Sequence, residues 1–196
     1  HAYFEICNNY IEDDRGTSSG SRSLEINNMR TTPGGTNLIS NNTIVSKGGT
    51  SSSMSYNIIV GIYFQSLSIG QNLVIANNYI KADNAYSLCC EYAIYSSSSM
   101  TNALVANNFW SSSTFINNFQ NSSLVDNGTS SVNWSYNTTT GILTSGTNLG
   151  LDQIEYRDIN NTRNDIGPSG GPHAWSNYNT TTGKAAVFNL ELPFQL

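Results

Sequence analysis

The pair Asn-Asn recurs along the chain between short apolar runs, and this repeat constrains the fold more than any other feature. Four close copies occupy residues 6–11, 38–44, 74–80 and 104–110. The first Asn of each copy follows the previous one by 33, 36 and 30 residues, at positions Asn8, Asn41, Asn77 and Asn107. These steps are too regular for chance and too variable for a helical repeat.

The repeat fits a coil of short strands joined by bends. Strands of four or five residues would alternate inward apolar and outward polar side chains. Asn tolerates left-handed backbone angles, so Asn-Asn would supply the bend. In stacked coils like residues align, and the sequence therefore predicts an amide ladder through Asn8, Asn41, Asn77 and Asn107. No segment carries the apolar stripe of an amphipathic helix, which favours an all-β fold.

The repeat also resembles that of a known family. Val60–Phe64 and Tyr92–Tyr95 precede two of the copies, and the combined pattern is Gly-Ile-x-x … Ile-x-Asn-Asn-x-Ile. This pattern resembles the right-handed parallel β-helix, a solenoid, of pectate-lyase-like and related surface proteins. The resemblance covers residues 1 to 145 and implies parallel β-helix coils in a domain spanning residues 1–150.

A second resemblance covers Asp158–Pro172. The segment is similar to D-x-D-G-[ST]-R-N-D-x-G-A-Y-G-G-P, which closes the β-helix in many bacterial secreted proteins. It agrees at Arg163, Asn164, Asp165, Gly167, Gly170, Gly171 and Pro172, and differs at Asn160, Asn161, Pro168 and Ser169. The resemblance implies a closing segment over residues 151–175 and a secreted or cell-surface location. Residues 176–196 are expected to form a C-terminal strand, either intermolecular or leading to a further domain, because apolar residues alternate up to Leu196.

Composition excludes several classes of partner. Charged residues make up 11% of the chain, its net charge is -5, and its 8 Lys and Arg are scattered singly. Nucleic acid needs clustered positive charge, so it is not expected as a partner. No apolar run approaches the roughly 18 residues of a membrane span. Cys7, Cys89 and Cys90 fit neither a disulfide framework nor a zinc site, and are expected to be apolar filler.

Charged residues are also too sparse to indicate a catalytic site. None occurs from Tyr92 to Val125. The lyase branch of the resembling family uses a Lys or Arg base, often with calcium, to remove a proton beside a uronate carboxylate. If the chain is an enzyme, a polysaccharide lyase with its site near Arg30, Lys47 and Lys81 is expected. We assign no catalytic residue and favour a non-enzymatic role.

Three further sets of residues are candidates for binding or modification. Oxygen-bearing side chains suited to calcium are Asp158, Asn160, Thr162 and Asp165, although turn capping explains them better. No other cofactor is expected. Glycosylation sequons cluster at Asn121, Asn127, Asn133 and Asn137, with others at Asn41, Asn160 and Asn179, and composition alone can produce them. Stacking platforms for a polysaccharide, or else core residues, are Tyr63, Tyr79, Tyr95 and Trp110.

The sequence therefore predicts an extracellular structural or adhesive scaffold, such as a subunit of a cell-surface fibre or stalk. The alternatives are a polysaccharide lyase-like carbohydrate-active enzyme and a passive glycan-binding module. Apolar alternation at both ends, from Ala2 and from Ala186, adds the expectation of head-to-tail self-association through strand edges. The alternative is that residues 184–196 fold back on their own coils or open a following domain.

Overall fold

The computed structural model describes most of the N-terminal two thirds of the chain and selected positions beyond it. The described residues are 3–14, 21–27, 35–48, 59–65, 72–84, 91–100, 103–112, 114–119, 124–125, 129–130, 149–150, 153–154, 158, 161, 163, 166–167 and 170–171. Over these residues the regular structure is β-strand, with no α-helix, as the all-β prediction requires. None of the described segments is a helix long and apolar enough to cross a membrane.

The strands form three parallel sheets, and successive strands of the chain enter them in rotation. Sheet A contains β1 (Glu5–Cys7), β4 (Asn37–Ser40), β7 (Leu73–Ala76), β10 (Ala103–Ala106) and β13 (Leu124–Val125). Sheet B contains β2 (Tyr10–Asp14), β5 (Thr43–Gly48), β8 (Tyr79–Asn84), β11 (Phe109–Ser111) and β14 (Thr129–Ser130). Sheet C contains β3 (Arg22–Asn27), β6 (Ile59–Gln65), β9 (Glu91–Met100) and β12 (Thr114–Phe119).

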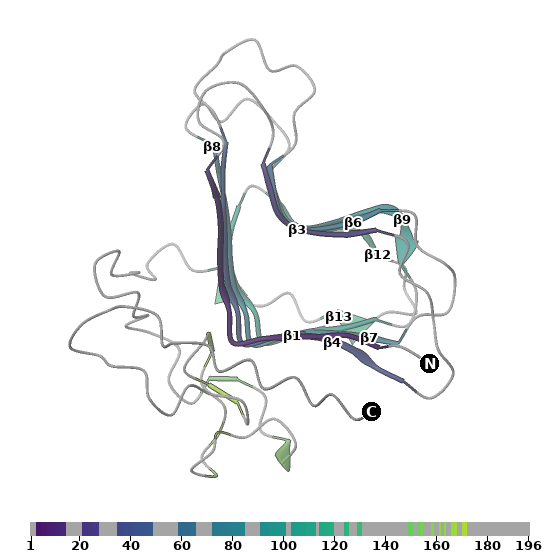
Figure 1. Cartoon of the computed structure of the whole chain (residues 1–196), viewed down its shortest axis with the longest axis vertical. Helices are drawn as coiled ribbons and strands as arrows, with labels where there is room; N and C mark the ends of the chain where they lie inside the picture. Colours follow the sequence, from purple (N-terminus) through teal and green to yellow (C-terminus); the bar gives the residue numbers. More distant parts are fainter. Residues whose placement is uncertain are drawn as a thin grey trace, which may run out of the picture.

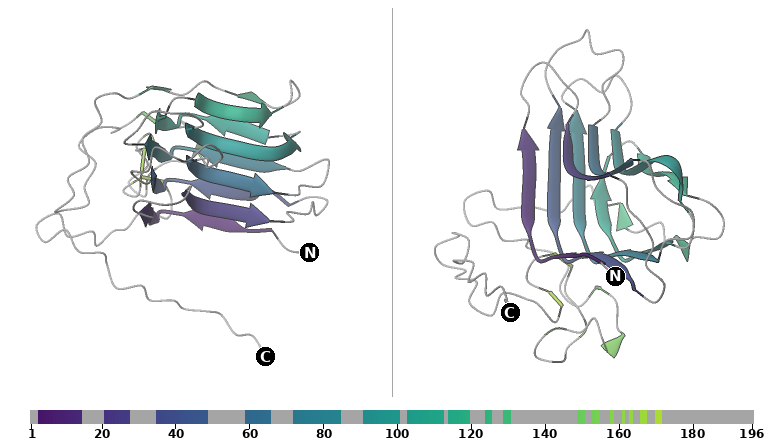
Figure 2. Two further views of the ribbon diagram at one scale, coloured as in Figure 1. Left: turned by 90° about the horizontal axis from the view of Figure 1, so that it is seen from above. Right: turned by 45° about the vertical axis from the view of Figure 1, so that its right-hand side comes forward.

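Each set of three consecutive strands, β1–β3, β4–β6, β7–β9 and β10–β12, forms one coil. The coils stack so that each strand pairs with the equivalent strand of the next coil (Figure 2). Viewed along the stack, the strands of one sheet nearly superimpose (Figure 1). This arrangement is compatible with a β-helix-like fold. In a parallel pair the inter-strand hydrogen bonds are evenly spaced along the strands, so neighbouring coils are joined along each paired strand.

The core lies between the three sheets and is built of stacked aliphatic columns. Ile39 of sheet A is in register with Ile6 and Ile75, and Ile44 of sheet B with Ile11 and Ile80. In sheet C, Ile62 is in register with Leu24 and Ile94. The middle residue of each column is fully buried. The alternation of apolar residues in each strand thus determines which face turns inward.

The bend between sheets A and B is made by the first Asn of each pair. Its φ is positive in all four copies: 57° at Asn8, 55° at Asn41, 58° at Asn77 and 50° at Asn107. Left-handed backbone costs most residues roughly 1–2 kcal/mol, and Asn is the non-glycine residue that adopts it most readily. The repeated Asn therefore fixes the same bend in every coil.

Candidate functional site

A ladder of buried amides runs along the inside of the A–B bend. Asn42, Asn78 and Asn108 are each fully buried. The Asn42 backbone and side-chain N–H groups both donate to Asn78 Oδ1, at 3.0 Å each. Asn78 repeats this with Asn108 Oδ1 at 3.0 and 2.9 Å, and Asn9 with Asn42 Oδ1 at 2.9 and 3.1 Å. Each amide thus joins one coil to the next.

The same amides also bond the backbone of sheet A. Asn42, Asn78 and Asn108 donate from Nδ2 to the carbonyls of Ile6, Ile39 and Ile75, at 2.7, 3.0 and 2.9 Å. The repeat pattern predicts a ladder through the preceding residue of each pair, but these amide-to-amide bonds lie one position later. The left-handed residue sets the bend, and the residue after it points into the turn. The sequence signal for these amide-to-amide bonds is that Asn occurs at both positions of the pair.

The first Asn of the first three pairs contacts the C-terminal part of the chain. Asn8 Nδ2 donates to the Gly170 carbonyl at 2.7 Å, and Asn41 Nδ2 donates to the Gly167 carbonyl at 3.2 Å. The Gly167 N–H donates to the Asn77 carbonyl at 2.9 Å. Gly167 and Gly170 of the predicted closing segment 151–175 therefore lie beside the A–B bends. Figure 1 shows the described C-terminal part of the chain on the outer side of the corner between β1 and β8.

Of the candidate calcium ligands, the structure describes Asp158. Its Oδ1 accepts the Gly171 N–H at 2.6 Å, and its carbonyl accepts the Asn161 N–H at 2.7 Å. Asn160, Thr162 and Asp165 lie outside the described residues. Arg163 donates from Nε to the Gly150 carbonyl at 2.7 Å. Across the described positions, no three His, Cys, Asp or Glu residues gather as a metal-binding group.

The lyase hypothesis placed a base near Lys47 and Lys81, on sheet B. Lys47 forms an ion pair with Glu12 of the neighbouring coil, and Tyr10 donates its hydroxyl to the other oxygen of the same carboxylate. The hydrogen bond from Lys47, helped by that from Tyr10, lowers the pKa of Glu12 below its usual value. A proton-abstracting base must be free to reach the substrate, whereas Nζ of Lys47 is bonded to the Glu12 carboxylate. Lys81 is in register with Val45 and Ser111, and Arg30 lies outside the described residues.

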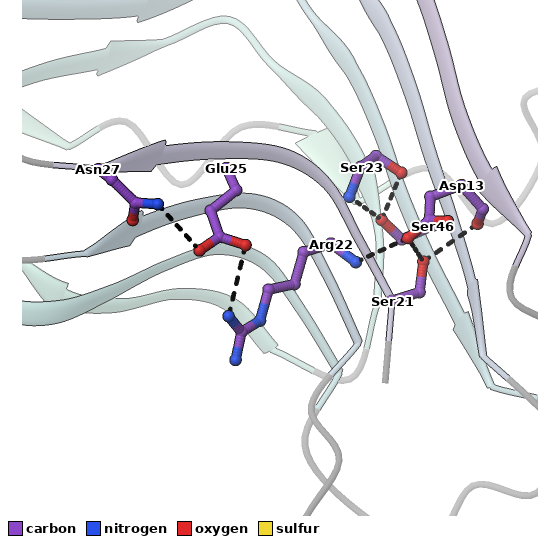
Figure 3. Close-up of polar contacts among 7 residues, drawn as sticks. All are labelled: Asp13, Ser21, Arg22, Ser23, Glu25, Asn27 and Ser46. Atoms are coloured by element: carbon purple, nitrogen blue, oxygen red, sulfur yellow. Dashed lines mark hydrogen bonds and ion pairs between the residues drawn. The ribbon is translucent and has the colours of Figure 1, made fainter. Parts of the chain in front are cut away.

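Sheet C carries a stack of tyrosine rings on one column. Tyr63 and Tyr95 are in register, with ring centroids 5.5 Å apart and planes 3° from parallel. The Arg22 guanidinium lies 4.0 Å from the Tyr63 ring centroid and pairs with Glu25 at 3.4 Å (Figure 3). Tyr63 therefore has a neighbour on both ring faces and is only 7% exposed.

The other predicted stacking platforms are also engaged inside the protein. Tyr79 is fully buried and meets Phe109 edge-on, at 5.2 Å between centroids. Trp110 is partly buried against the core. These positions support the interpretation of the rings as packing residues, since a sugar needs a free ring face to stack on.

A polar corner between sheets B and C has no counterpart among the predictions from sequence. The Asp13 carboxylate accepts the Ser21 hydroxyl at 3.0 Å and the Arg22 N–H at 3.1 Å (Figure 3). One coil along, Ser46 accepts the Ser23 N–H at 3.1 Å and donates to the Val60 carbonyl at 2.5 Å. These bonds satisfy backbone groups where the chain turns inside the stack. The sequence around Asp13 suggests only a solvated loop charge, because it gives no sign of these partners.

The glycosylation and cysteine candidates are only partly described. Asn121, Asn127, Asn133 and Asn137 lie outside the described residues, whereas the sequon residue Asn41 is 2% exposed and bonded to Gly167. Cys7 is a free cysteine whose Sγ lies 3.3 Å from Ser40 Oγ, and burial raises the pKa of its thiol. Cys89 and Cys90 lie outside the described residues.

Comparison with known proteins returned no match to a protein-family model, a curated protein or a solved structure. Function is therefore inferred from the contacts within this chain and from its sequence.

Proposed function

We propose that the chain forms a right-handed parallel β-helix and serves as an extracellular structural or adhesive scaffold. The observation that carries this proposal is the continuous amide ladder from Asn9 through Asn42 and Asn78 to Asn108. It binds four consecutive coils along one edge, in parallel with three hydrogen-bonded sheets. Such a stack resists bending and shear because every coil is bonded to its neighbours at several points around the section.

The secreted or cell-surface location and the kinship with pectate-lyase-like proteins are further parts of the proposal. They rest on the resemblances of the repeat and of residues 158–172 to secreted β-helix proteins. The pairing of Lys47 with Glu12 supports a scaffold over a lyase, since it occupies one of the candidate bases.

A forced-unfolding experiment tests the scaffold directly. Pulling single molecules by their ends should release coils in steps near 33, 36 and 30 residues, about 105–125 Å each at roughly 3.5 Å per extended residue. Replacing Asn78 with Leu should lower the force of these steps. If the unaltered chain and the Asn78→Leu variant release their coils at the same forces, the ladder has no mechanical role.

An activity assay tests the rival function. Pectate, alginate and chondroitin incubated with the protein should yield no unsaturated uronide, measured by its ultraviolet absorbance. Turnover that Lys47→Ala or Lys81→Ala abolishes, with folding retained, would replace the scaffold by a lyase.

Self-association is the third part of the proposal. β1, β2 and β3 are the terminal strands of their sheets, and within the described residues no strand pairs with their outer edges. An edge of this kind can add a strand from a neighbouring molecule, and a head-to-tail contact would extend the stack. Sedimentation velocity over a concentration series should show growing species. A single monomer at every concentration would overturn this part.

A further inference from the structure

The described residues of Ile166–Gly171 lie against the outer side of the A–B bends, which are formed by residues far earlier in the sequence. The Gly170 carbonyl meets Asn8, 162 residues away, and the Gly167 carbonyl meets Asn41, 126 residues away. We propose that the outer side of these bends is a peptide-docking site, whose resident ligand is the chain's own segment Ile166–Gly171. This proposal is independent of whether the scaffold bears load or binds other molecules.

The spacing of donors and acceptors supports a specific fit. Asn8 and Asn41 belong to adjacent coils, and adjacent parallel strands lie about 4.8 Å apart. Two carbonyls three residues apart in an extended peptide would lie about 10 Å apart, which is about twice the spacing between the two Asn residues. The Gly170 N–H donates to the Gly167 carbonyl at 3.0 Å, and this turn brings the two ends within about 7 Å. The folded turn therefore matches the coil spacing, and an extended strand would not.

An apolar anchor precedes the turn. Ile166 is 2% exposed and packs with Tyr79 and Phe109, which are in register on sheet B and meet edge-on. The three residues form a cluster separate from the main core. The next residue, Gly167, donates its N–H to the Asn77 carbonyl at 2.9 Å. Anchor and turn together contact the first four coils.

Glycine is required at two of the contact positions. Gly167 has φ 96° and Gly171 has φ 82°, conformations that side chains disfavour. Asp158 Oδ1 accepts the Gly171 N–H and holds the far end of the turn. The ligand chemistry is thus an apolar residue followed by Gly-x-x-Gly-Gly, with two carbonyls presented to the Asn amides.

The docked segment is separable from the fold beneath it. None of the described residues from Leu149 to Gly171 belongs to a strand of the three sheets. Release of Ile166–Gly171 would therefore leave the sheet hydrogen bonds in place, whereas release of a sheet strand would break them.

The first test is hydrogen exchange on the full chain. Ile166→Ala should raise exchange of the Gly167 amide by about 30-fold or more, because truncation of a buried Ile removes most of the anchor. The sheet amides of Ile39 and Ile75 should stay protected. Ile154→Ala is the matched control, since Ile154 is 78% exposed in the same region. Equal Gly167 exchange in both variants would overturn the proposal.

The second test is docking in trans. A synthetic peptide of residues 158–173 should bind the Ile166→Ala chain saturably, measured by fluorescence anisotropy, and should bind the unaltered chain at least tenfold more weakly because its site is occupied. The same peptide carrying Ile166→Ala should not compete. If the variant chain shows released Gly167 and intact sheets yet binds neither peptide, or binds both equally, no docking site exists.

Discussion

The backbone N–H and the side-chain amide of Asn78 both donate to one oxygen of Asn108, Oδ1, at 3.0 and 2.9 Å. This relationship repeats between Asn42 and Asn78. Each Oδ1 therefore accepts two bonds from the coil before it, while each Nδ2 also reaches a carbonyl of sheet A. Satisfied buried polar networks of this kind specify a single register between the coils.

Replacing Asn78 with Leu should lower the free energy of unfolding by about 2 kcal/mol or more. The change leaves the Asn42 N–H and the Ile39 carbonyl without their described side-chain partner, and each buried unpaired group costs about 1–3 kcal/mol. Asn108 Oδ1 loses the side-chain donor but keeps the backbone N–H of residue 78. Urea unfolding measures the loss. Asn27→Leu is the control, because Asn27 is exposed, and it should change stability by less than about 0.5 kcal/mol. Similar losses in both variants would contradict the ladder.

Substitution by glycine should reduce stability to different extents at the two members of an Asn pair. At Asn77, where φ is 58°, Asn77→Gly keeps a backbone conformation that glycine adopts freely. At Asn78 the same substitution removes the ladder amide. Asn78→Gly should therefore lower the free energy of unfolding more than Asn77→Gly does, with a difference of at least about 1 kcal/mol. Urea unfolding of the two variants measures this difference. The reverse order would show that the bend residue, and not the ladder residue, carries the energy.

Gly61 should not accept even a methyl group. A Cβ there would lie 2.3 Å from Ile80 Cγ2 and 2.8 Å from the Ala93 carbonyl oxygen, which belongs to the backbone of the next coil. Gly61→Ala should destabilise by about 1–3 kcal/mol through overpacking. Gln65→Ala, at an exposed position of the same strand, serves as the comparison in thermal unfolding. Unchanged stability of Gly61→Ala would mean that β6 and β9 are farther apart than described.

The Glu12–Lys47 pair should make a small part of the stability depend on pH. Because the pKa of Glu12 is lowered in the folded protein, its ionised form favours folding above the unfolded-state pKa of about 4.3. That contribution disappears as the pH falls through the lowered folded value. Glu12→Gln should therefore cost less than about 1 kcal/mol at neutral pH, and nothing below the folded pKa.

An NMR titration checks the cause of this shift. Lys47→Met should raise the pKa of the Glu12 carboxyl toward its usual value, since the Lys47 hydrogen bond is the main cause of the lowering. The Tyr10 hydrogen bond should retain part of the shift. An unaltered Glu12 titration in the Lys47 variant would rule out the pair in solution.

Much of the coil geometry is encoded in local pattern. Alternating apolar residues and Asn-Asn bends predict short strands, and the structure confirms an all-β fold of parallel sheets. The rotation of strands through three sheets is not readable from the sequence, because the bend between sheets B and C lacks a repeated residue. Asp13 and Ser46 contribute to that corner through partners 8 to 23 positions away.

The sequence by itself determined where the chain bends, since only a residue that tolerates positive φ can stand at Asn8, Asn41, Asn77 and Asn107. It also determined which strand faces are apolar. Tertiary structure alone decided which Asn of each pair carries the ladder, because side-chain direction depends on the backbone angles of the bend. It likewise decided that Gly167 and Gly170 meet Asn41 and Asn8, since contacts over more than 100 residues depend on how the coils stack and leave no local pattern.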